Sequence, residues 1–475
     1  MKKLLIALLL PLLVFTSCKK DLTSINVNPK APQSVSAPSL FTNAEHVLSD
    51  LMASSNVNLN IFRLVDQYWQ EVTYTDESNY DLQTRPIPQN MWNTLYRDIL
   101  EDLEQSKTIE DATISAVQKK NQDAMADILQ VYSYYYLVTT YGNIPYTDAL
   151  NIEATTAPKY DDQAAVYNAL LTRLDGDIAA LDNTDAGYGS ADIIYGGDID
   201  AWVLFANSFK LKMGITLADA DDAKAKSVVE SAVAAGVFSS NADNALFAYK
   251  SGPPNTNPIW VDLVQSGRKD FVANETIINV MSPLNDPRIP LYFTNDFAGG
   301  YSGGKPGASS NYTTFSKPAE KIVAADFPGV LLSYDETEFA LAEAVERGYN
   351  VGGTALQHYN AAVSASILYW GGNTTQATAY LAQPSVNYLT ATGTYKQKIG
   401  MQKWIALYNR GWDGWIEVRR LDYPALVAPA SALSDFPVRF TYPVNEQNLN
   451  TANYDAAASA IGGDMVETKL FFDKF

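Results

Sequence analysis

Side chains that could perform covalent or metal-assisted chemistry are scarce in this sequence. Its 475 residues include two histidines, His46 and His358, which lie far apart in the chain, and a single cysteine, Cys18. A Ser-His-Asp triad or a histidine-rich zinc site would depend on one of these histidines, so we expect neither. The 53 acidic residues leave a pair of glycosidase carboxylates open at this stage. We expect a protein without a bound metal or cofactor.

Aromatic side chains are abundant by comparison, with 29 Tyr, 18 Phe and 8 Trp, and asparagine is frequent throughout. Flat rings pack against the C–H faces of pyranose sugars, while amide and carboxylate groups bond the hydroxyls. This composition therefore suits a neutral polyhydroxylated ligand. Any single ring is nevertheless more often part of a core.

The charge balance excludes some partners. The formal net charge is -19 at pH 7, spread in short runs along the chain. Such a balance repels phosphate backbones and anionic lipid surfaces, so we expect no nucleic-acid binding and no electrostatic docking to membranes. With 47% hydrophobic residues, the chain can bury a large core.

The first eighteen residues have the pattern of a lipoprotein signal. Lys2 and Lys3 precede an apolar run from Leu4 to Phe15, and Cys18 follows shortly after. We expect residues 1–17 to be a cleaved signal peptide and Cys18 to receive the lipid. The run is shorter than the roughly 20 apolar residues that span a bilayer, and no second long apolar segment follows, so the lipid would be the membrane attachment.

The rest of the chain is predicted to be mainly α-helical. Residues 18–38 are rich in Asn, Pro and Ser and are expected to form a lipidated, flexible tether. Apolar residues then recur at helical spacing, beginning near Ser39. The segments with this spacing are residues 40–52, 91–105, 121–142, 161–181, 200–219, 221–236, 333–348 and 355–372.

The succession of helix, short turn and helix indicates tetratricopeptide-like helix pairs, without a clean 34-residue period. Three long stretches rich in Gly, Pro, Ser and Asn interrupt the helices, at residues 250–258, 297–318 and 428–453. Loops of this length inside a compact protein are uncommon unless they bind something or are disordered. We expect one helical domain over residues 39–475, with these irregular loops binding the ligand.

The segments YGNIPYTDAL, YGGDIDAW and QKWIALYNRGWDGWIEVRR, together with NVNPKAP and VRFTYPVNEQNLN, occur in an order that resembles the SusD/RagB family of starch-utilisation-type lipoproteins. The resemblance is closest to its SusD-like second subfamily and covers nearly the whole mature chain. It implies an α-helical fold of four tetratricopeptide-like helix pairs, with loops forming the ligand face.

The resemblance also implies a non-catalytic function. Family members capture oligosaccharides at the outer face of a Gram-negative outer membrane and pass them to a TonB-dependent, SusC-like transporter barrel. We therefore expect a lipid-anchored, surface-facing glycan-binding protein. One departure is that Lys19 and Lys20 follow Cys18, where surface-directed members often carry acidic residues.

Ligand contacts are expected in residues 69–92, the region that corresponds to the aromatic arc of the founding family members. This region lies between two helical patterns, and aromatic residues outside a periodic apolar stripe are expected to face solvent. Trp260 and Tyr312 lie in further irregular stretches. The predicted ligand-binding residues are Trp69, Tyr74, Asp76, Tyr80, Arg85, Trp260 and Tyr312.

The segment QKWIALYNRGWDGWIEVRR is expected to be scaffold. Its three tryptophans and the pair Arg419 and Arg420 suggest a buried aromatic and ion-pair corner, with Glu417 or Asp422 as the acidic partner. A double arginine can also bind a carboxylated sugar, but structural pairing is the preferred interpretation.

Two alternatives remain for the function. A surface lipoprotein of the same fold could bind a peptide or another partner in place of a glycan. A glycosidase would require two carboxylates facing each other across a deep cleft, although no stretch of the sequence shows the alternating strands and helices of a barrel.

Overall fold

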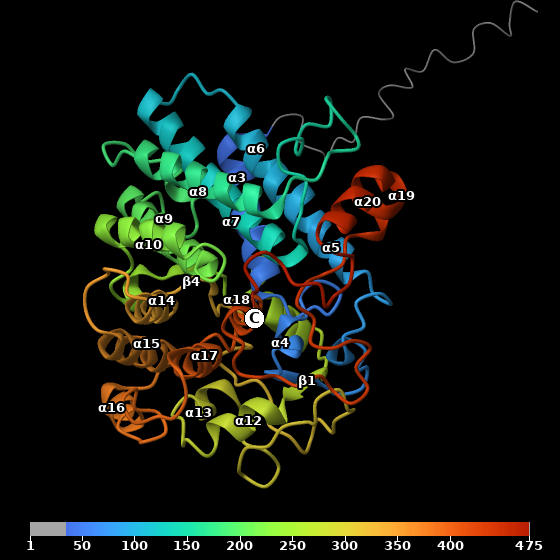
Figure 1. Ribbon diagram of the computed structural model, residues 1–475, viewed down its shortest axis with the longest axis vertical. Coiled ribbons are helices and arrows are strands. Elements are labelled where there is room, and N and C mark those ends of the chain that lie inside the picture. The colour runs from blue at the N-terminus through green and yellow to red at the C-terminus, as the bar shows by residue number, and fades with distance from the viewer. Residues whose placement is uncertain (1–34, 475) are drawn as a thin grey trace, which may run out of the picture. The chain divides into compact units, whose positions relative to one another are not determined.

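Pairs of consecutive helices that pack against each other form the scaffold (Figure 1). The chain is described by a computed structural model over residues 35–474, and Ala37–Phe475 forms one compact unit. The pairs are α7 (Ala116–Tyr141) with α8 (Gln163–Ala180), α9 (Ile199–Leu217) with α10 (Asp222–Ala235), α14 (Tyr334–Glu346) with α15 (Ala355–Trp370), and α17 (Tyr395–Ala406) with α18 (Gly411–Leu421). The predicted tetratricopeptide-like helical fold is confirmed.

Further helices complete the body, and α3 packs against α6 beside the first pair. They are α3 (Ala37–Ala53), α4 (Phe62–Val65), α5 (Ile87–Asn93), α6 (Glu101–Thr108), α11 (Pro258–Trp260), α12 (Glu275–Met281), α13 (Ile289–Tyr292), α16 (Thr374–Leu381), α19 (Val444–Leu449) and α20 (Thr451–Ala460). No helix among residues 35–474 has the length and apolar character needed to cross a membrane. The signal peptide, Cys18 and most of the predicted tether lie outside the described residues.

Two of the three predicted loops are irregular, whereas the third is partly helical. Residues 428–453 contain α19 and the first residues of α20, so the expectation of a continuous loop is wrong there. The physical reason is exposure, because α19 buries no side chain and α20 buries only Ala457. Helices on the surface without an apolar face leave no periodic signal in the sequence.

Local capping explains where the longest helix begins and ends. Ser115 precedes α7, and its Oγ accepts a hydrogen bond from the backbone N–H of Gln118 at 2.9 Å. At the other end Gly142 adopts φ 88°, a conformation that side chains with a Cβ disfavour. The predicted helix end at Gly142 is confirmed.

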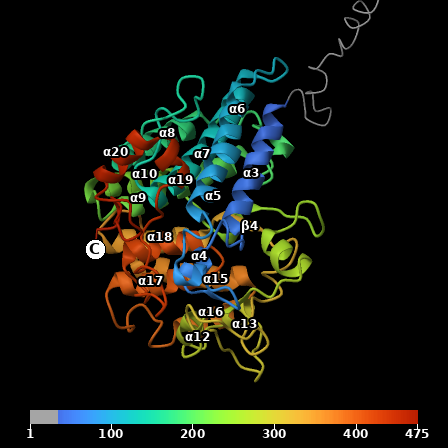
Figure 2. The same ribbon diagram turned by 90° about the vertical axis from the view of Figure 1, so that its right-hand side faces the viewer.

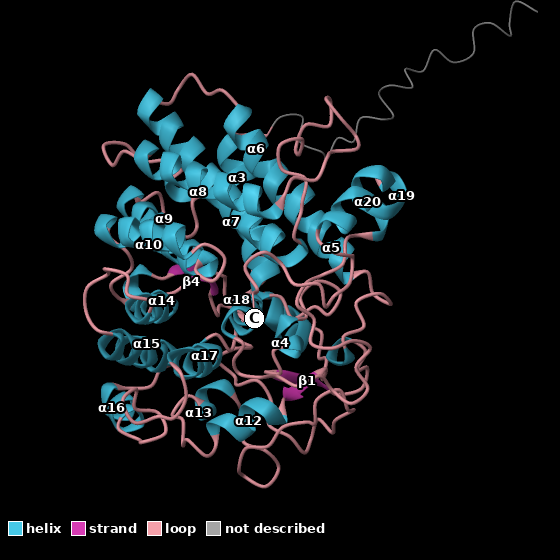
Figure 3. Ribbon diagram, in the orientation of Figure 1, coloured by secondary structure: helices cyan, strands magenta, loops and turns pink. Residues whose placement is uncertain are grey.

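The strands are few and short, and helices dominate the molecule (Figure 3). β1 (Trp69–Glu71) pairs antiparallel with β3 (Phe271–Ala273), with Trp69 opposite Ala273. β2 (Ala245–Phe247) pairs antiparallel with β4 (Gly329–Leu332). These two-stranded sheets join loops that are far apart in the sequence.

A network of buried charges links three helices of the scaffold. Lys212 of α9 lies 2.9 Å from a carboxylate oxygen of Glu336 on α14 and also pairs with Asp413 of α18. Arg410 lies 2.7 Å from Glu336 and 2.7 Å from Asp413. Burial alone would raise the pKa of Glu336, but the charges of Arg410 and Lys212 outweigh burial and lower it to about 2. The two cations therefore keep Glu336 ionised at neutral pH.

The network continues along α18 as the predicted aromatic and ion-pair corner. Arg420 pairs with Glu417 at 2.5 Å and with Glu343 of α14 at 2.6 Å. Arg419 lies with its guanidinium carbon 3.4 Å from the centre of the Trp415 ring. The corner and the Glu417 pairing are confirmed, and Glu343 takes the place proposed for Asp422. Helix α18 lies beside α4 at the centre of both views (Figures 1 and 2).

Candidate functional site

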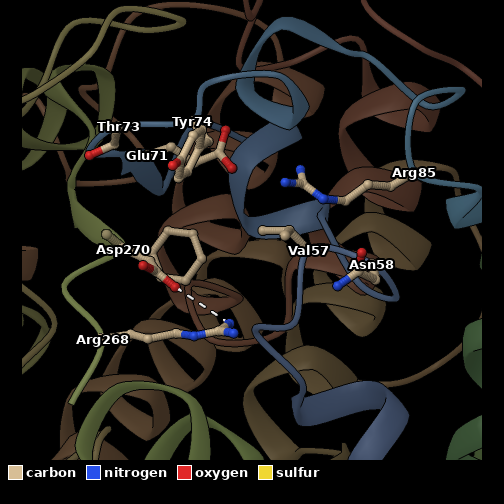
Figure 4. A pocket seen from close by; sticks show the side chains of 9 residues that line it. Val57, Asn58, Glu71, Thr73, Tyr74, Arg85, Arg268 and Asp270 are labelled. Carbon is tan, nitrogen blue, oxygen red and sulfur yellow. Dashed lines mark ion pairs between the residues drawn. The ribbon is translucent and has the colours of Figure 1, made fainter. Parts of the chain in front are cut away.

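A cleft of about 330 Å³ opens where three loop regions meet (Figure 4). Val57 and Asn58 enter it from the loop after α3. Tyr74 enters from the loop after β1, and Arg268 comes from the segment before β3. The two guanidinium groups that line the cleft, those of Arg85 and Arg268, point toward its centre from opposite sides in Figure 4. Side chains distant in sequence are thus brought to one surface.

The β1–β3 pair positions this cleft. The ladder continues past β1, because the backbone N–H of Val72 donates to the carbonyl of Asp270 at 2.8 Å. Beneath it, the ring centres of Trp69 and Phe271 lie 5.4 Å apart. Trp69 Nε1–H donates to the Tyr408 hydroxyl at 2.8 Å. The floor is therefore fixed by a packed and hydrogen-bonded layer, from which Tyr74 projects.

The predicted ligand residues divide into two groups. Tyr74 is 73% exposed and lines the cleft together with Arg85. Trp69 and Tyr80, expected to face solvent, are only 1% and 3% exposed, so that expectation is wrong. Trp69 belongs to a strand whose residues are all buried, and the Tyr80 ring packs edge-on against Phe436. Both rings are covered by protein, and Trp69 packs against Phe271, which lines the cleft.

The other three predicted residues do not line the cleft. Asp76 is exposed at the start of a short 3-10 turn, Glu77–Asn79. Trp260 is half-buried at the end of α11, and Tyr312 is half-buried in the loop between Phe297 and Pro318. The structure describes their positions, and their role in ligand binding stays a prediction.

Sequence reasoning missed most of the polar lining. Asn58, Arg268 and Asp270 were not singled out, and neither was Glu71. One available signal was the segment SGRKDFVAN, in which Gly267 adopts φ 70° and charged residues directly precede an apolar strand. Charged residues at a strand entrance usually stay at the surface, and the pairing with β1 brings them to the cleft.

A carboxyl pair lies beside the cleft. Glu71 is 4% exposed, and one of its oxygens accepts the backbone N–H of Ser78 at 2.8 Å. Burial, followed by a hydrogen bond with Glu77, raises the pKa of Glu71 to about 9. Glu77 in turn pairs with Arg85. At neutral pH Glu71 is therefore an uncharged acid, while Glu77 and Arg85 neutralise each other.

These groups suit recognition of hydroxyl-rich ligands. Tyr74 offers an open ring face, and Arg85 retains N–H donors beyond the one it gives to Glu77. Arg268 and Asp270 lie 3.8 Å apart with side chains 60% and 44% exposed, so their pairing is weak and both can contact a ligand. An exposed ring beside paired donors and acceptors is the arrangement that holds a pyranose.

A second cavity, of about 410 Å³, lies between α12 and α17. Two of its polar side chains are already bonded to the protein. The Tyr359 hydroxyl donates to the Val386 carbonyl at 2.8 Å, and Lys398 Nζ donates to the Tyr388 carbonyl at 3.0 Å. Tyr359 is 1% exposed and cannot present its ring to a ligand. The Tyr74 cleft is therefore the stronger candidate.

The stacked helix pairs, together with loops that form a cleft, define a protein of the SusD-like class. The model of the SusD-like family described as "Starch-binding associating with outer membrane" matches residues 29–443. The chain belongs to this family, which confirms the resemblance in the sequence. Members of the family are binding proteins.

Solved structures agree with this assignment. A SusD homologue from Bacteroides uniformis is 26% identical, with a TM-score of 0.76 over 92% of this chain and 99% of that chain. A chitin-binding SusD homologue from Flavobacterium johnsoniae is 25% identical, with a TM-score of 0.77 over 92% and 98%. A SusD homologue from Bacteroides vulgatus, 24% identical, shares the fold with a TM-score of 0.79 over 91% and 97%. No curated protein matches the sequence significantly.

The uncharged state of Glu71 predicts a pH-dependent stability. The folded chain keeps the Glu71 proton up to about pH 9, whereas the ordinary pKa is 4.5. The contribution of this proton to the free energy of unfolding is fully present below pH 4.5. It decreases steadily as the pH rises from 4.5 and is lost once the pH has passed about 9. Glu71→Gln keeps an uncharged side chain of the same shape and removes the titration. In urea unfolding, we expect its free energy of unfolding relative to wild type to increase steadily from pH 5 to pH 9.

Glu110→Gln is the matched control, because Glu110 is exposed in the loop after α6. Its difference from wild type should stay constant over the same range. Parallel pH profiles for wild type and Glu71→Gln would contradict the proposed protonation of Glu71.

Proposed function

We propose that this protein is a non-catalytic receptor that captures an oligosaccharide in the Tyr74 cleft. The observation that carries the proposal is the Tyr74 ring, which is 73% exposed at the edge of a polar cleft. A tyrosine ring left in water forgoes the free energy of burial, and such exposed rings often mark binding surfaces. A sugar face would cover the ring, and its hydroxyls would bond Arg268, Asp270 and Asn58.

The comparisons support a glycan as the ligand. The family description names starch, and the name of the Flavobacterium johnsoniae homologue names chitin. Both polymers consist of pyranose rings whose C–H faces can pack on tyrosine. The identity of the sugar is set by the lining of the cleft, which in this chain combines Tyr74 with two arginines.

The chemistry of the cleft supports binding without catalysis. A glycosidase needs one carboxylic acid and one free carboxylate placed on either side of the scissile bond. Glu71 is an acid here, but its carboxyl group is hydrogen-bonded to Ser78 and Glu77. Asp270 pairs with Arg268 and directly precedes the neighbouring strand, β3. Because of these hydrogen bonds and this ion pair, we assign the two carboxyl groups to structure and to ligand binding, and not to the roles of a glycosidase acid and base.

The proposal includes a lipid anchor and a partner. Cys18 follows the signal sequence and would carry the lipid that holds the protein at the outer face of a Gram-negative outer membrane. Residues 18–38 would then serve as the tether. The captured oligosaccharide would pass to a TonB-dependent, SusC-like transporter in the same membrane, as the SusD/RagB resemblance implies.

Replacement of Tyr74 tests the capture site. We expect Tyr74→Ala to weaken binding on a glycan array by about 1–2 kcal/mol, roughly 5- to 30-fold, because one ring contact is removed. Isothermal titration with the best array ligand gives the affinity. The matched control is Ile152→Ala, which removes an equally exposed side chain, 80% in wild type, from the α7–α8 loop.

Ile152→Ala should bind like wild type. An unchanged affinity in Tyr74→Ala would contradict ligand binding in the cleft. A wild-type protein that binds no glycan would contradict the proposed function.

Replacement of Cys18 tests the anchor. We expect Cys18→Ala to abolish incorporation of radiolabelled palmitate and to move the protein from the outer-membrane fraction to the soluble fraction of expressing cells. The anchor is covalent, so high salt should not release the wild-type protein. A Cys18→Ala protein that still sediments with outer membranes after a salt wash would contradict attachment by lipid alone.

A further inference from the structure

A second aromatic side chain, that of Tyr312, belongs to a loop that is hydrogen-bonded to the segment carrying Tyr74. Tyr312 is half-buried in the loop between Phe297 and Pro318. The ammonium group of Lys269 lies 5.8 Å from the centre of its ring, and that of Lys317 lies 5.4 Å away. Contacts between ammonium groups and an aromatic ring are attractive and restrict the lysine side chains. Two positive charges are thereby gathered around one ring.

No carboxylate of the described chain pairs with either of these two lysines. The chain has 53 acidic residues against 34 basic ones. Even so, within residues 35–474 neither Lys269 nor Lys317 forms an ion pair, and each contacts Tyr312 instead. Two cations beside one ring attract an anionic group, and no carboxylate of the described chain already neutralises them. The patch formed by Lys269, Tyr312 and Lys317 is therefore suited to an anionic group.

Backbone hydrogen bonds connect this patch to the Tyr74 cleft. The N–H of Ser310 donates to the carbonyl of Val72 at 2.8 Å, and the N–H of Val72 donates to the carbonyl of Asp270 at 2.8 Å. Tyr312 lies two residues beyond Ser310, Tyr74 lies two residues beyond Val72, and Lys269 directly precedes Asp270. The three segments run side by side, so the patch continues the cleft along its edge.

We propose that the Lys269–Tyr312–Lys317 patch is a subsite for the negatively charged substituent, carboxylate or sulfate, of a saccharide bound in the Tyr74 cleft. The inference rests on the proposed function and specifies its ligand class as acidic saccharides. It differs from the neutral ligand that the aromatic composition alone suggests.

The charges in the cleft agree with this class. Arg268, 3.8 Å from Asp270 and 60% exposed, adds a third cation at the junction of cleft and patch. The net charge of -19 repels long polyanions such as nucleic acids. A short saccharide with isolated charges contacts the three local cations without meeting the rest of the surface.

Matched pairs of ligands test the proposal. One pair is an oligogalacturonate and its methyl ester, and the other is a sulfated galactan oligosaccharide and its desulfated form. Both pairs are placed on an array with neutral starch and chitin oligosaccharides. We expect wild type to bind at least one charged member at least tenfold more tightly than its uncharged counterpart, and less tightly as salt increases. The pair in which the charged member binds more tightly shows whether the patch takes a carboxylate or a sulfate.

Lysine variants then test whether the preference for the charged ligand comes from this patch. Lys269→Gln/Lys317→Gln should lose at least tenfold in affinity for the charged ligand and keep its affinity for the uncharged counterpart. The control Lys120→Gln/Lys226→Gln makes the same change in net charge on the exposed surfaces of α7 and α10 and should stay within twofold of wild type.

The outcomes separate the two proposals. Equal affinity for charged and uncharged members overturns the acidic subsite, as does an equal loss in the control variant. Binding to neutral oligosaccharides that depends on Tyr74 but not on the two lysines retains the proposed function and overturns the subsite. Absence of binding to every glycan overturns both.

Discussion

The structure depends most on the buried ion-pair network around Asp413. Lys212, Glu336 and Arg410 surround this carboxylate and join α9, α14 and the start of α18. A charge buried without a partner costs several kcal/mol, so each member of the network requires the others in place. The network therefore specifies how the helix pairs meet, while the apolar faces between the helices supply most of the stability. The SusD-like motif YNRGWDGWIEVRR encodes one side of it.

This network reaches the cleft through α4. The helix α4 packs against α18, and Arg63 of α4 donates to the Asn409 carbonyl at 2.8 Å. The same guanidinium lies 5.1 Å from the centre of the Trp69 ring at the start of β1. Tyr74 follows β1 by three residues, so the exposed ring is attached to a strand that Arg63 and Tyr408 hold in place. Binding groups on such a rigid support lose little conformational entropy when a ligand binds.

Much of the scaffold could be predicted from the sequence, and less of the site. Helices such as α3 bury an apolar face and therefore repeat apolar residues at helical spacing, and Gly142 marks the end of α7 with a conformation that only a glycine readily adopts. Helix α19 buries nothing and left no such signal. Trp69 was misjudged because a three-residue strand buried on both faces lacks any periodicity. Arg268 and Asp270 could not be joined to Tyr74, because that contact depends on strand pairing over some two hundred residues.

A buried charge network and a short strand pair thus hold an exposed tyrosine in place for the proposed capture of a saccharide. Hydrogen–deuterium exchange with and without a saturating oligosaccharide from the array tests this most directly, because it reports the whole chain at once. The account predicts added protection in residues 69–85 and 268–273, with the scaffold helices unchanged. Protection confined to residues 383–402, beside the second cavity, with none around Tyr74, would contradict it.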